Sequence, residues 1–239
     1  MPRRGKKYIE AAQKVDRTKL YAPREALELV KQISYTNFDG TVELHLRMGL
    51  DPRRSDQQIR GVVSLPYGLG KQVRVLVFAS AEAEAAARAA GADYIISDEE
   101  GFKKISDGWT DFDVAIAVPE IMPKVGRLGR VLGRKGLMPN PKTGTVVNAE
   151  DLARAVKEAK AGRVEYRLDR TGNIHLPLGK VSAPVDELFA NLSAIMETIR
   201  RVKPAAAKGT YVKRVTIAPS MGPGVRVDPN AALALESGA

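Results

Sequence analysis

Regular alternation of polar and apolar positions dominates both ends of the chain. Residues 41–48 alternate over eight positions, which is the period of a strand that buries one face. The other segments with this texture are 58–65, 164–168, 173–176 and 210–218. The turn residues at 169–172 predict that 164–168 and 173–176 pair as a hairpin. Apolar residues at helical spacing predict helices over 8–15, 23–30 and 184–202.

The middle of the chain has a different pattern. Residues 73–79 form a nearly continuous apolar run, which is typical of a parallel strand buried on both faces. Further strands are predicted at 93–97 and 113–118, and helices at 81–90, 99–105 and 149–160. Because strands and helices alternate here, we expect a parallel α/β sheet between residues 68 and 159.

These two textures predict a discontinuous domain. Residues 1–67 and 160–230 share the alternating pattern, so we expect them to form one α+β domain. An α/β domain of residues 68–159 is then inserted between two of its strands. Residues 231–239 are expected to be a disordered tail.

The charge is distributed as unevenly as the hydrophobic pattern. The chain of 239 residues carries 38 Lys and Arg against 28 Asp and Glu, a net charge of +10. Residues 1–67 hold 13 basic and 8 acidic side chains, residues 68–160 hold 14 and 13, and residues 161–239 hold 11 and 7. The excess therefore lies in the discontinuous domain and favours an anionic partner there. An even spread of charge over the folded surface remains the alternative.

Composition also limits the compartment and the chemistry. The chain has no cysteine, which excludes disulfides, thiolate metal sites and a cysteine nucleophile, and is compatible with a reducing compartment. The basic N-terminus is followed by polar residues instead of an apolar export segment. No apolar run is long enough to span a membrane. We expect a cytoplasmic protein without a membrane partner.

No residue pattern supports an enzyme. Gly68 and Gly70 precede a predicted strand, in the wrong order for a dinucleotide-binding turn. Residues 136–143 have the spacing of a phosphate-binding loop, but Pro141 replaces its glycine. His45 and His175 are far apart in sequence and are expected on strand surfaces. We therefore expect no catalytic residue, metal or cofactor; the rival class is an α/β protein that handles a small molecule or nucleotide.

One segment of the middle domain is strongly basic. Residues 121–149 contain no acidic side chain, and glycines recur through them. Their basic residues are Lys124, Arg127, Arg130, Arg134, Lys135 and Lys142. Two interpretations stay open, a solvated basic loop and a secondary surface that contacts phosphates.

Several features of the discontinuous domain favour RNA. Aromatic residues make up only 5% of the chain, so shape, sugar and phosphate contacts are favoured over base stacking. The predicted turn at 169–172 offers the Arg170 guanidinium, the Thr171 hydroxyl and a glycine N–H at one tip. Residues 220–223 follow the last strand and combine a soft apolar Met221 with a glycine. Phe38 is either a core anchor at the start of the strand or a lone apolar contact on the binding face, and the residues alone favour the core anchor.

The chain resembles a known family over nearly its whole length. The most specific motif is the run at residues 122–146, MPKVGRLGRVLGRKGLMPNPKTGTV. Other matching motifs are FDGTVE at 38–43, LDPRRSD at 50–56, LPYGLGK at 65–71, AGRVEYR at 161–167, KGT at 208–210 and MGP at 221–223. These motifs are similar to those of the L-one family of large-subunit ribosomal proteins, the ribosomal stalk proteins, in its bacterial branch.

This resemblance implies a fold and a function. The family fold is a split α+β RNA-binding domain with an inserted Rossmann-like domain that binds no nucleotide. Members bind a folded stalk region of large-subunit ribosomal RNA and support release of deacylated tRNA from the exit site. Members also repress translation by binding their own messenger RNA. The resemblance therefore implies a non-enzymatic ribosomal protein, monomeric when free, with ribosomal RNA, its own messenger RNA and, transiently, exit-site tRNA as partners.

The resemblance also implies particular RNA contacts. Together with Arg170 at the predicted turn, the expected RNA-binding residues are Phe38, Thr41, Glu43, Arg54, Asp169, Thr171, Gly172, Ser220, Met221, Gly222 and Pro223. Phe38 thereby moves from the expected core to the expected binding face. Asn37 stands where relatives often have a basic residue, and Ser220 where they often have threonine.

Overall fold

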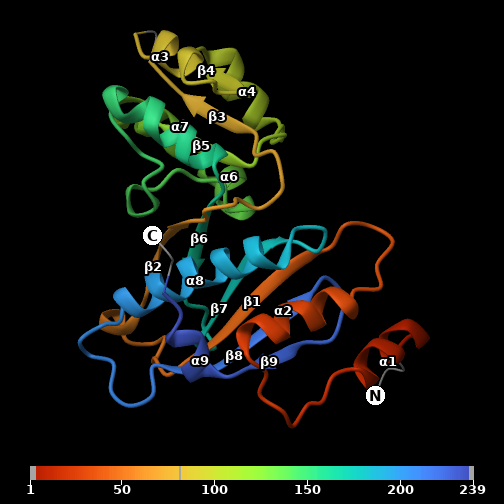
Figure 1. The fold of residues 1–239 in the computed structure, drawn as a ribbon. Coiled ribbons are helices and arrows are strands. Elements are labelled where there is room, and N and C mark those ends of the chain that lie inside the picture. The colour runs from red at the N-terminus through yellow and green to blue at the C-terminus, as the bar shows by residue number, and fades with distance from the viewer. Residues whose placement is uncertain (1–3, 81, 237–239) are drawn as a thin grey trace. The chain divides into compact units, whose positions relative to one another are not determined.

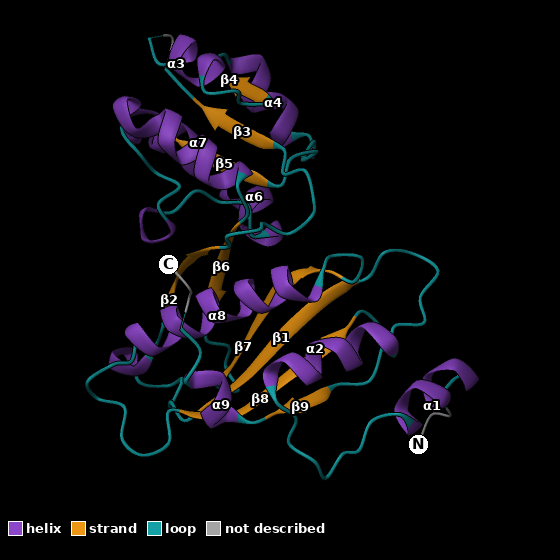
Figure 2. Ribbon diagram, in the orientation of Figure 1, coloured by secondary structure: helices purple, strands orange, loops and turns teal. Residues whose placement is uncertain are grey.

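The computed structural model describes residues 4–80 and 82–236. The chain divides into two compact units. The terminal unit is Met1–Gly70 together with Val164–Ala239, and the middle unit is Lys71–Arg163. The chain contains both helices and strands, so the fold is mixed α and β (Figure 2).

An antiparallel sheet of four described strands forms the centre of the terminal unit (Figure 1). Its order is β7 (Asn173–Lys180), β1 (Thr41–Met48), β8 (Val212–Pro219) and β9 (Val225–Val227). The helices on one of its faces are α2 (Pro23–Gln32), α8 (Val185–Arg201) and α9 (Pro229–Leu233). Near the N-terminus, α1 covers Lys6–Gln13.

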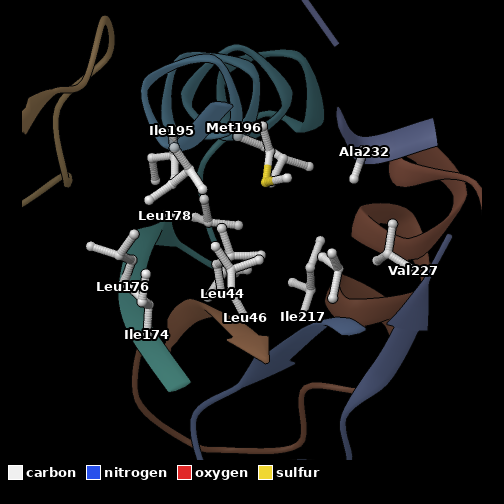
Figure 3. Close-up of a cluster of buried hydrophobic side chains, with 14 of the residues drawn as sticks. Leu44, Leu46, Ile174, Leu176, Leu178, Ile195, Met196, Ile217, Val227 and Ala232 are labelled. Atoms are coloured by element: carbon white, nitrogen blue, oxygen red, sulfur yellow. The ribbon is translucent and has the colours of Figure 1, made fainter. Parts of the chain in front are cut away.

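The core of the terminal unit lies between this sheet and its helices (Figure 3). Leu44 and Leu46 of β1 and Ile217 of β8 are buried with Ile195 and Met196 of α8, and none of the five is more than 1% exposed. Burial of each such side chain contributes about 1.5–3 kcal/mol. The alternation read from the sequence thus fixes which face of the sheet packs against the helices.

The opposite face of the same sheet is polar. Thr41, Glu43, His45 and Arg47 alternate with the buried residues of β1, and each is half-buried or exposed. Because β1 pairs with β7 and β8 on its two sides, these residues lie along the middle of a continuous sheet surface. We call this surface the open face.

A second, two-stranded sheet corrects the predicted hairpin. β6 (Arg163–Arg167) pairs with β2 (Arg60–Ser64), whereas β7 pairs with β1, so the predicted pairing of 164–168 with 173–176 is wrong. The turn itself is present, because the N–H of Asp169 donates to the carbonyl of Asn173 at 2.8 Å. Just before it, the N–H of Leu168 donates to the carbonyl of Ile59, which keeps the incoming strand with β2. The chain therefore passes from one sheet to another at this turn.

The middle unit contains a parallel sheet in the order β4 (Tyr94–Ile96), β3 (Val75–Phe78) and β5 (Val114–Ala117). Its helices include α3 (Glu84–Ala89), α4 (Glu99–Ser106) and α7 (Leu152–Lys160). Both faces of the sheet are covered, because Val75 and Val77 belong to one core cluster and Leu76 and Phe78 to another.

Two further expectations need correction. The basic segment is not a loop, since α5 (Met122–Gly126) and α6 (Gly129–Lys135) occupy much of it, anchored by the buried Val125 and Leu132. The expected disordered tail at 231–239 is wrong for its first residues, because α9 runs to Leu233 and buries Ala232 completely. Residues 237–239 lie outside the described part of the chain.

Candidate nucleic-acid interface

Two large apolar side chains are exposed at one end of the four-stranded sheet. Phe38, just before β1, is 57% exposed, and Met221, just after β8, is 72% exposed. The interpretation of Phe38 as a core anchor is therefore wrong. The Thr36 hydroxyl donates to the carbonyl of Phe38 at 3.0 Å, so the chain turns there and the core of this strand begins only at Val42.

Ser220 links the two segments that carry these side chains. Its N–H donates to the carbonyl of Thr41 at 2.9 Å, and its hydroxyl oxygen accepts a hydrogen bond from the N–H of Thr41 at 3.0 Å. The end of β8 is thereby fixed to the start of β1. Phe38 and Met221 consequently lie on two segments that flank neighbouring, anchored strand ends.

Met221 has an unusual backbone conformation. Its φ of 61° is the only positive value among the described non-glycine residues. The N–H of Gly222 donates to the carbonyl of Pro219 at 3.0 Å, and the hydroxyl of Tyr35 donates to the carbonyl of Met221 at 2.6 Å. These bonds hold a residue with a side chain in the left-handed region, which costs roughly 1–2 kcal/mol. The turn also requires Gly222, because a Cβ there would lie 2.5 Å from Cγ of Pro219.

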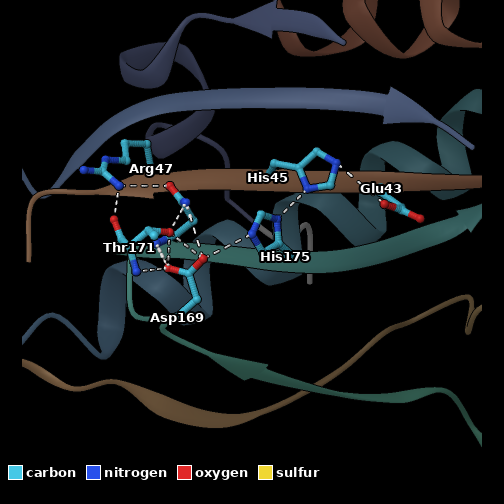
Figure 4. A network of polar contacts seen from close by, with 7 residues as sticks. Glu43, His45, Arg47, Asp169, Thr171 and His175 are labelled. Carbon is cyan, nitrogen blue, oxygen red and sulfur yellow. Dashed lines mark hydrogen bonds and ion pairs between the residues drawn. The ribbon is translucent and has the colours of Figure 1, made fainter. Parts of the chain in front are cut away.

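A line of polar contacts crosses the open face (Figure 4). The Nδ1 atoms of His45 and His175 lie 2.8 Å apart. At the outer ends, Glu43 Oε2 lies 3.6 Å from Nε2 of His45, and Asp169 Oδ2 lies 3.6 Å from Nε2 of His175. A hydrogen bond between two Nδ1 atoms needs one donor and one acceptor, so at least one of the two rings is neutral. Burial lowers the pKa of His45, proximity to His175 lowers it further, and Glu43 opposes both effects.

Asp169 organises the turn that leads into β7. Its Oδ1 accepts hydrogen bonds from the N–H groups of Thr171 at 2.8 Å and Asn173 at 2.7 Å, and its Oδ2 accepts one from the Thr171 hydroxyl. Partial burial works against ionisation, but these hydrogen bonds outweigh it and lower the pKa of Asp169 to about 2. Arg47 donates to the carbonyl of Thr171, which ties the turn to β1.

The remaining predicted residues differ in exposure. Arg170 is exposed at the tip of the turn, and Arg54 is exposed in the loop after β1, where it pairs with Asp56 at 2.8 Å. Gly172 and Pro223 are buried. We therefore expect these two to shape their turns without offering a contact surface.

The predicted residues gather mainly at the two ends of the open face. Phe38, Thr41, Ser220 and Met221 lie at one end, and Asp169 with its turn lies at the other. Five residues of β1 lie between Thr41 and Arg47, so six residue steps, about 20 Å of strand, separate the two. Arg54 is apart from both groups and lines a cavity of about 640 Å³ with Lys208 and Lys213.

The described residues contain neither a candidate metal-binding group nor a candidate membrane-spanning helix. Within them, His, Asp and Glu side chains nowhere form a group of three or more that could hold a metal ion. Helices of a length and hydrophobicity that would cross a membrane are likewise absent from residues 4–80 and 82–236.

Known proteins are similar in sequence to this chain. A family model described as "Ribosomal protein L1p/L10e family" matches residues 30–223. The chain belongs to the Ribosomal protein L1p/L10e family. Two relatives, from Chloroflexus aurantiacus strains J-10-fl and Y-400-fl, are both named "Large ribosomal subunit protein uL1". Each is 57% identical over 237 residues, which are 99% of this chain and 100% of the relative. The resemblance inferred from the motifs is confirmed.

The structure adds three residues to the candidate site that sequence reasoning missed. Tyr35 and Arg47 hold the two turns, and Lys180 donates to the carbonyl of Asp39 and to the hydroxyl of Thr41, both at 3.3 Å. Arg47 could have been found, because it continues the polar side of the alternating strand. Tyr35 could not, since no spacing links it to Met221, 186 residues away.

The basic residues predicted in the middle unit are all on its surface. Those of α5, the turn after it, α6 and the segment that follows are Lys124, Arg127, Arg130, Arg134, Lys135 and Lys142, each exposed. Lys135 donates to the hydroxyl of Thr110. None of the six forms an ion pair with another described residue, so their charges are not neutralised within that part of the chain.

Proposed function

We propose that this chain is a structural protein of the large ribosomal subunit and binds a folded region of its ribosomal RNA through the open face. Met221 is the observation that carries the proposal. It combines a left-handed backbone with a 72% exposed apolar side chain, and both are unfavourable in the free protein. Such strain is typical of a site whose binding partner offsets it.

The chemistry of the open face fits the sugar edge of a folded RNA. Glu43 and Asp169 are carboxylates that can accept hydrogen bonds from 2′-hydroxyl groups but would repel phosphates. The exposed Arg170 supplies charge-assisted contacts to phosphates at the margin. Phe38 and Met221 offer apolar surface to a base or ribose.

The finer roles follow from the resemblance and belong to the same proposal. The terminal unit is the discontinuous RNA-binding domain, and the middle unit is an inserted Rossmann-like domain that binds no nucleotide. The RNA is the ribosomal stalk region. The protein acts in the cytoplasm within the ribosome, supports release of deacylated tRNA from the exit site, represses its own messenger RNA, and is a monomer without cofactor or enzymatic activity when free.

Filter binding with a stalk RNA fragment and an unrelated hairpin, at several salt concentrations, tests the RNA-binding proposal. The wild-type chain should bind the stalk fragment at least about 1000-fold more tightly than the hairpin. Met221→Asp should remove this preference, because it places a carboxylate against RNA. Aspartate tolerates the left-handed backbone, so the fold should be preserved.

Leu20→Asp is the matched control. Leu20 is 54% exposed and precedes Tyr21, which pairs with Val227 of the edge strand β9, so the substitution adds the same charge away from β1 and β7. It should leave the preference for the stalk fragment nearly unchanged. Equal binding of both RNAs by the wild-type chain, or equal losses in the two variants, would refute the proposal.

A second pair of variants tests the link between the two exposed side chains. Ser220→Thr keeps the hydroxyl that accepts from Thr41, whereas Ser220→Ala removes it and leaves that N–H without its partner. We expect Ser220→Ala to weaken binding of the stalk fragment roughly tenfold and Ser220→Thr to bind like the wild type. Identical affinities for both variants would show that the hydroxyl does not position the site.

The nucleotide alternative has its own test. If the middle unit bound a nucleotide, ATP or NAD at millimolar concentration would raise the melting temperature of the chain. We expect no shift with either compound.

A further inference from the structure

Three rows of residues can be traced through α5, the two-residue turn at 127–128 and α6 in the middle unit. Within each row the residues stand at positions i, i+3 and i+7, the spacing of one helix side, and the joint burial of Val125, Leu128 and Leu132 shows that this spacing persists across the turn. The buried row is Val125, Leu128 and Leu132; the second row is Gly126, Gly129 and Gly133; the third is Arg127, Arg130 and Arg134. Each row is offset from the previous one by one residue, about 100° around the helix.

The glycine row has no explanation within the described fold. A Cβ built at Gly126, Gly129 or Gly133 would meet no atom within 4 Å, so alanine would fit at all three positions. Gly136 differs, because it ends α6 with a φ of 71°, which favours glycine. Gly133 lies in the body of α6, where glycine is unfavourable relative to alanine, whereas Gly126 ends α5 and Gly129 begins α6. Glycines that no internal contact requires indicate that a partner approaches the helix closely.

The arginine row indicates what that partner is. Arg127, Arg130 and Arg134 are exposed, and none pairs with an acidic side chain among the described residues. No acidic residue occurs between 121 and 149, and three lysines add to the same charge. Unpaired guanidinium groups beside a smooth backbone surface complement a phosphate chain.

We propose that the glycine and arginine rows of α5 and α6 form a second RNA-binding surface, which takes the sugar-phosphate backbone of a folded RNA without reading its sequence. The arginines contact phosphates, and the glycines let the ribose edge approach the helix backbone. Because the chain belongs to a ribosomal protein family, RNA is the polyanion that surrounds it. All of these residues belong to the middle unit, whereas the open face belongs to the terminal unit.

Fluorescence anisotropy with a labelled RNA duplex of mixed sequence tests this surface. All chains carry Met221→Asp, so that the open face contributes as little as possible. The triple variant Arg127→Gln, Arg130→Gln, Arg134→Gln should bind the duplex roughly tenfold more weakly at low salt. The slope of log affinity against log salt should also become shallower by about 2–3, because each phosphate contact contributes about 0.9.

A charge-matched control separates a specific surface from the effect of net charge. The triple variant Lys103→Gln, Lys104→Gln, Lys157→Gln also removes three exposed positive charges from the middle unit. It should change affinity and salt slope much less. Equal effects of the two triple variants would mean that only the total charge attracts RNA, and no effect of either would overturn the proposal in favour of another partner.

The glycine row allows a test that leaves the charge unchanged. Gly129→Ala with Gly133→Ala should raise the melting temperature, because alanine favours the helix and meets no obstacle. The same double variant should bind the RNA duplex severalfold more weakly, because two methyl groups stand where its backbone approaches. A lower melting temperature would show that the glycines serve the fold, and unchanged RNA affinity would show that nothing approaches them.

Discussion

The sheets of the two units differ in how many faces they bury. In the terminal unit, neighbours along one strand have opposite environments: Leu46 is 1% exposed, whereas Arg47 is exposed. In the middle unit, every residue of β3 from Val75 to Phe78 is fully buried, because helices cover both faces. The first sheet can therefore bind a partner directly, whereas the second can do so only through its helices and loops.

The largest expected effect concerns the strand that is buried on both sides. Phe78→Ala should lower the free energy of unfolding by about 3–5 kcal/mol, and Val77→Ala, on the opposite face, by about 1–3 kcal/mol. The unfolding of both variants can be followed by the fluorescence of Trp109, the chain's single tryptophan, which packs in the middle unit. If Val77→Ala had no effect, one face of this sheet would be open and the contrast between the units would fail.

Substitutions at two neighbouring positions of β8 in the terminal unit should have unequal effects on stability. Ile217→Ala should lower the free energy of unfolding by about 2–4 kcal/mol, because Ile217 is completely buried in the core. Thr216→Ala, one residue earlier and on the open face, should change it by less than about 1 kcal/mol. Chemical denaturation followed by far-ultraviolet circular dichroism measures both. Similar losses for the two variants would contradict a free sheet face.

The sequence was most informative where one strand's own pattern decides the structure. The alternation over 41–48 predicted β1 with its correct ends, and the apolar run around Val75 predicted β3. The predicted hairpin failed because partner choice is not local: β2 pairs with β6 although about a hundred residues separate them. β9 was missed because three residues are too few to show a period.

Three further features show what the sequence could and could not predict. α9 could have been predicted, since Asp228 caps the N–H of Asn230 and Pro229 occupies the first helical position. The backbone of Met221 could not, because a left-handed methionine has no sequence signature. The exposure of Phe38 was likewise beyond hydrophobicity alone, and only the resemblance placed it at the candidate site.

The turn at one end of the open face should be acid-sensitive. The pKa of Asp169 in the folded chain, about 2, lies below its ordinary value of 3.8, so ionised Asp169 stabilises the fold above about pH 4. This contribution is lost as the pH falls from about 4 towards 2. Asp169 is 37% exposed, which reduces the expected size to about 1 kcal/mol. Asp169→Asn should lower stability at pH 7 by this amount and abolish the corresponding acid dependence in thermal unfolding.

The smallest expected effect concerns the histidine pair in the middle of the open face. Because the pKa of His45 is lowered in the folded chain, the unfolded chain binds more protons just below the ordinary pKa of 6.5. Stability should therefore decline as the pH falls from about 7 through that range, and His45→Gln should remove the decline. His175→Gln, which also breaks the Nδ1 contact, should reduce it, since His175 contributes to the lowered pKa. If both variants keep the wild-type pH profile between 7 and 5, the pair is not electrostatically coupled, and the open face differs from the middle sheet only in its exposure.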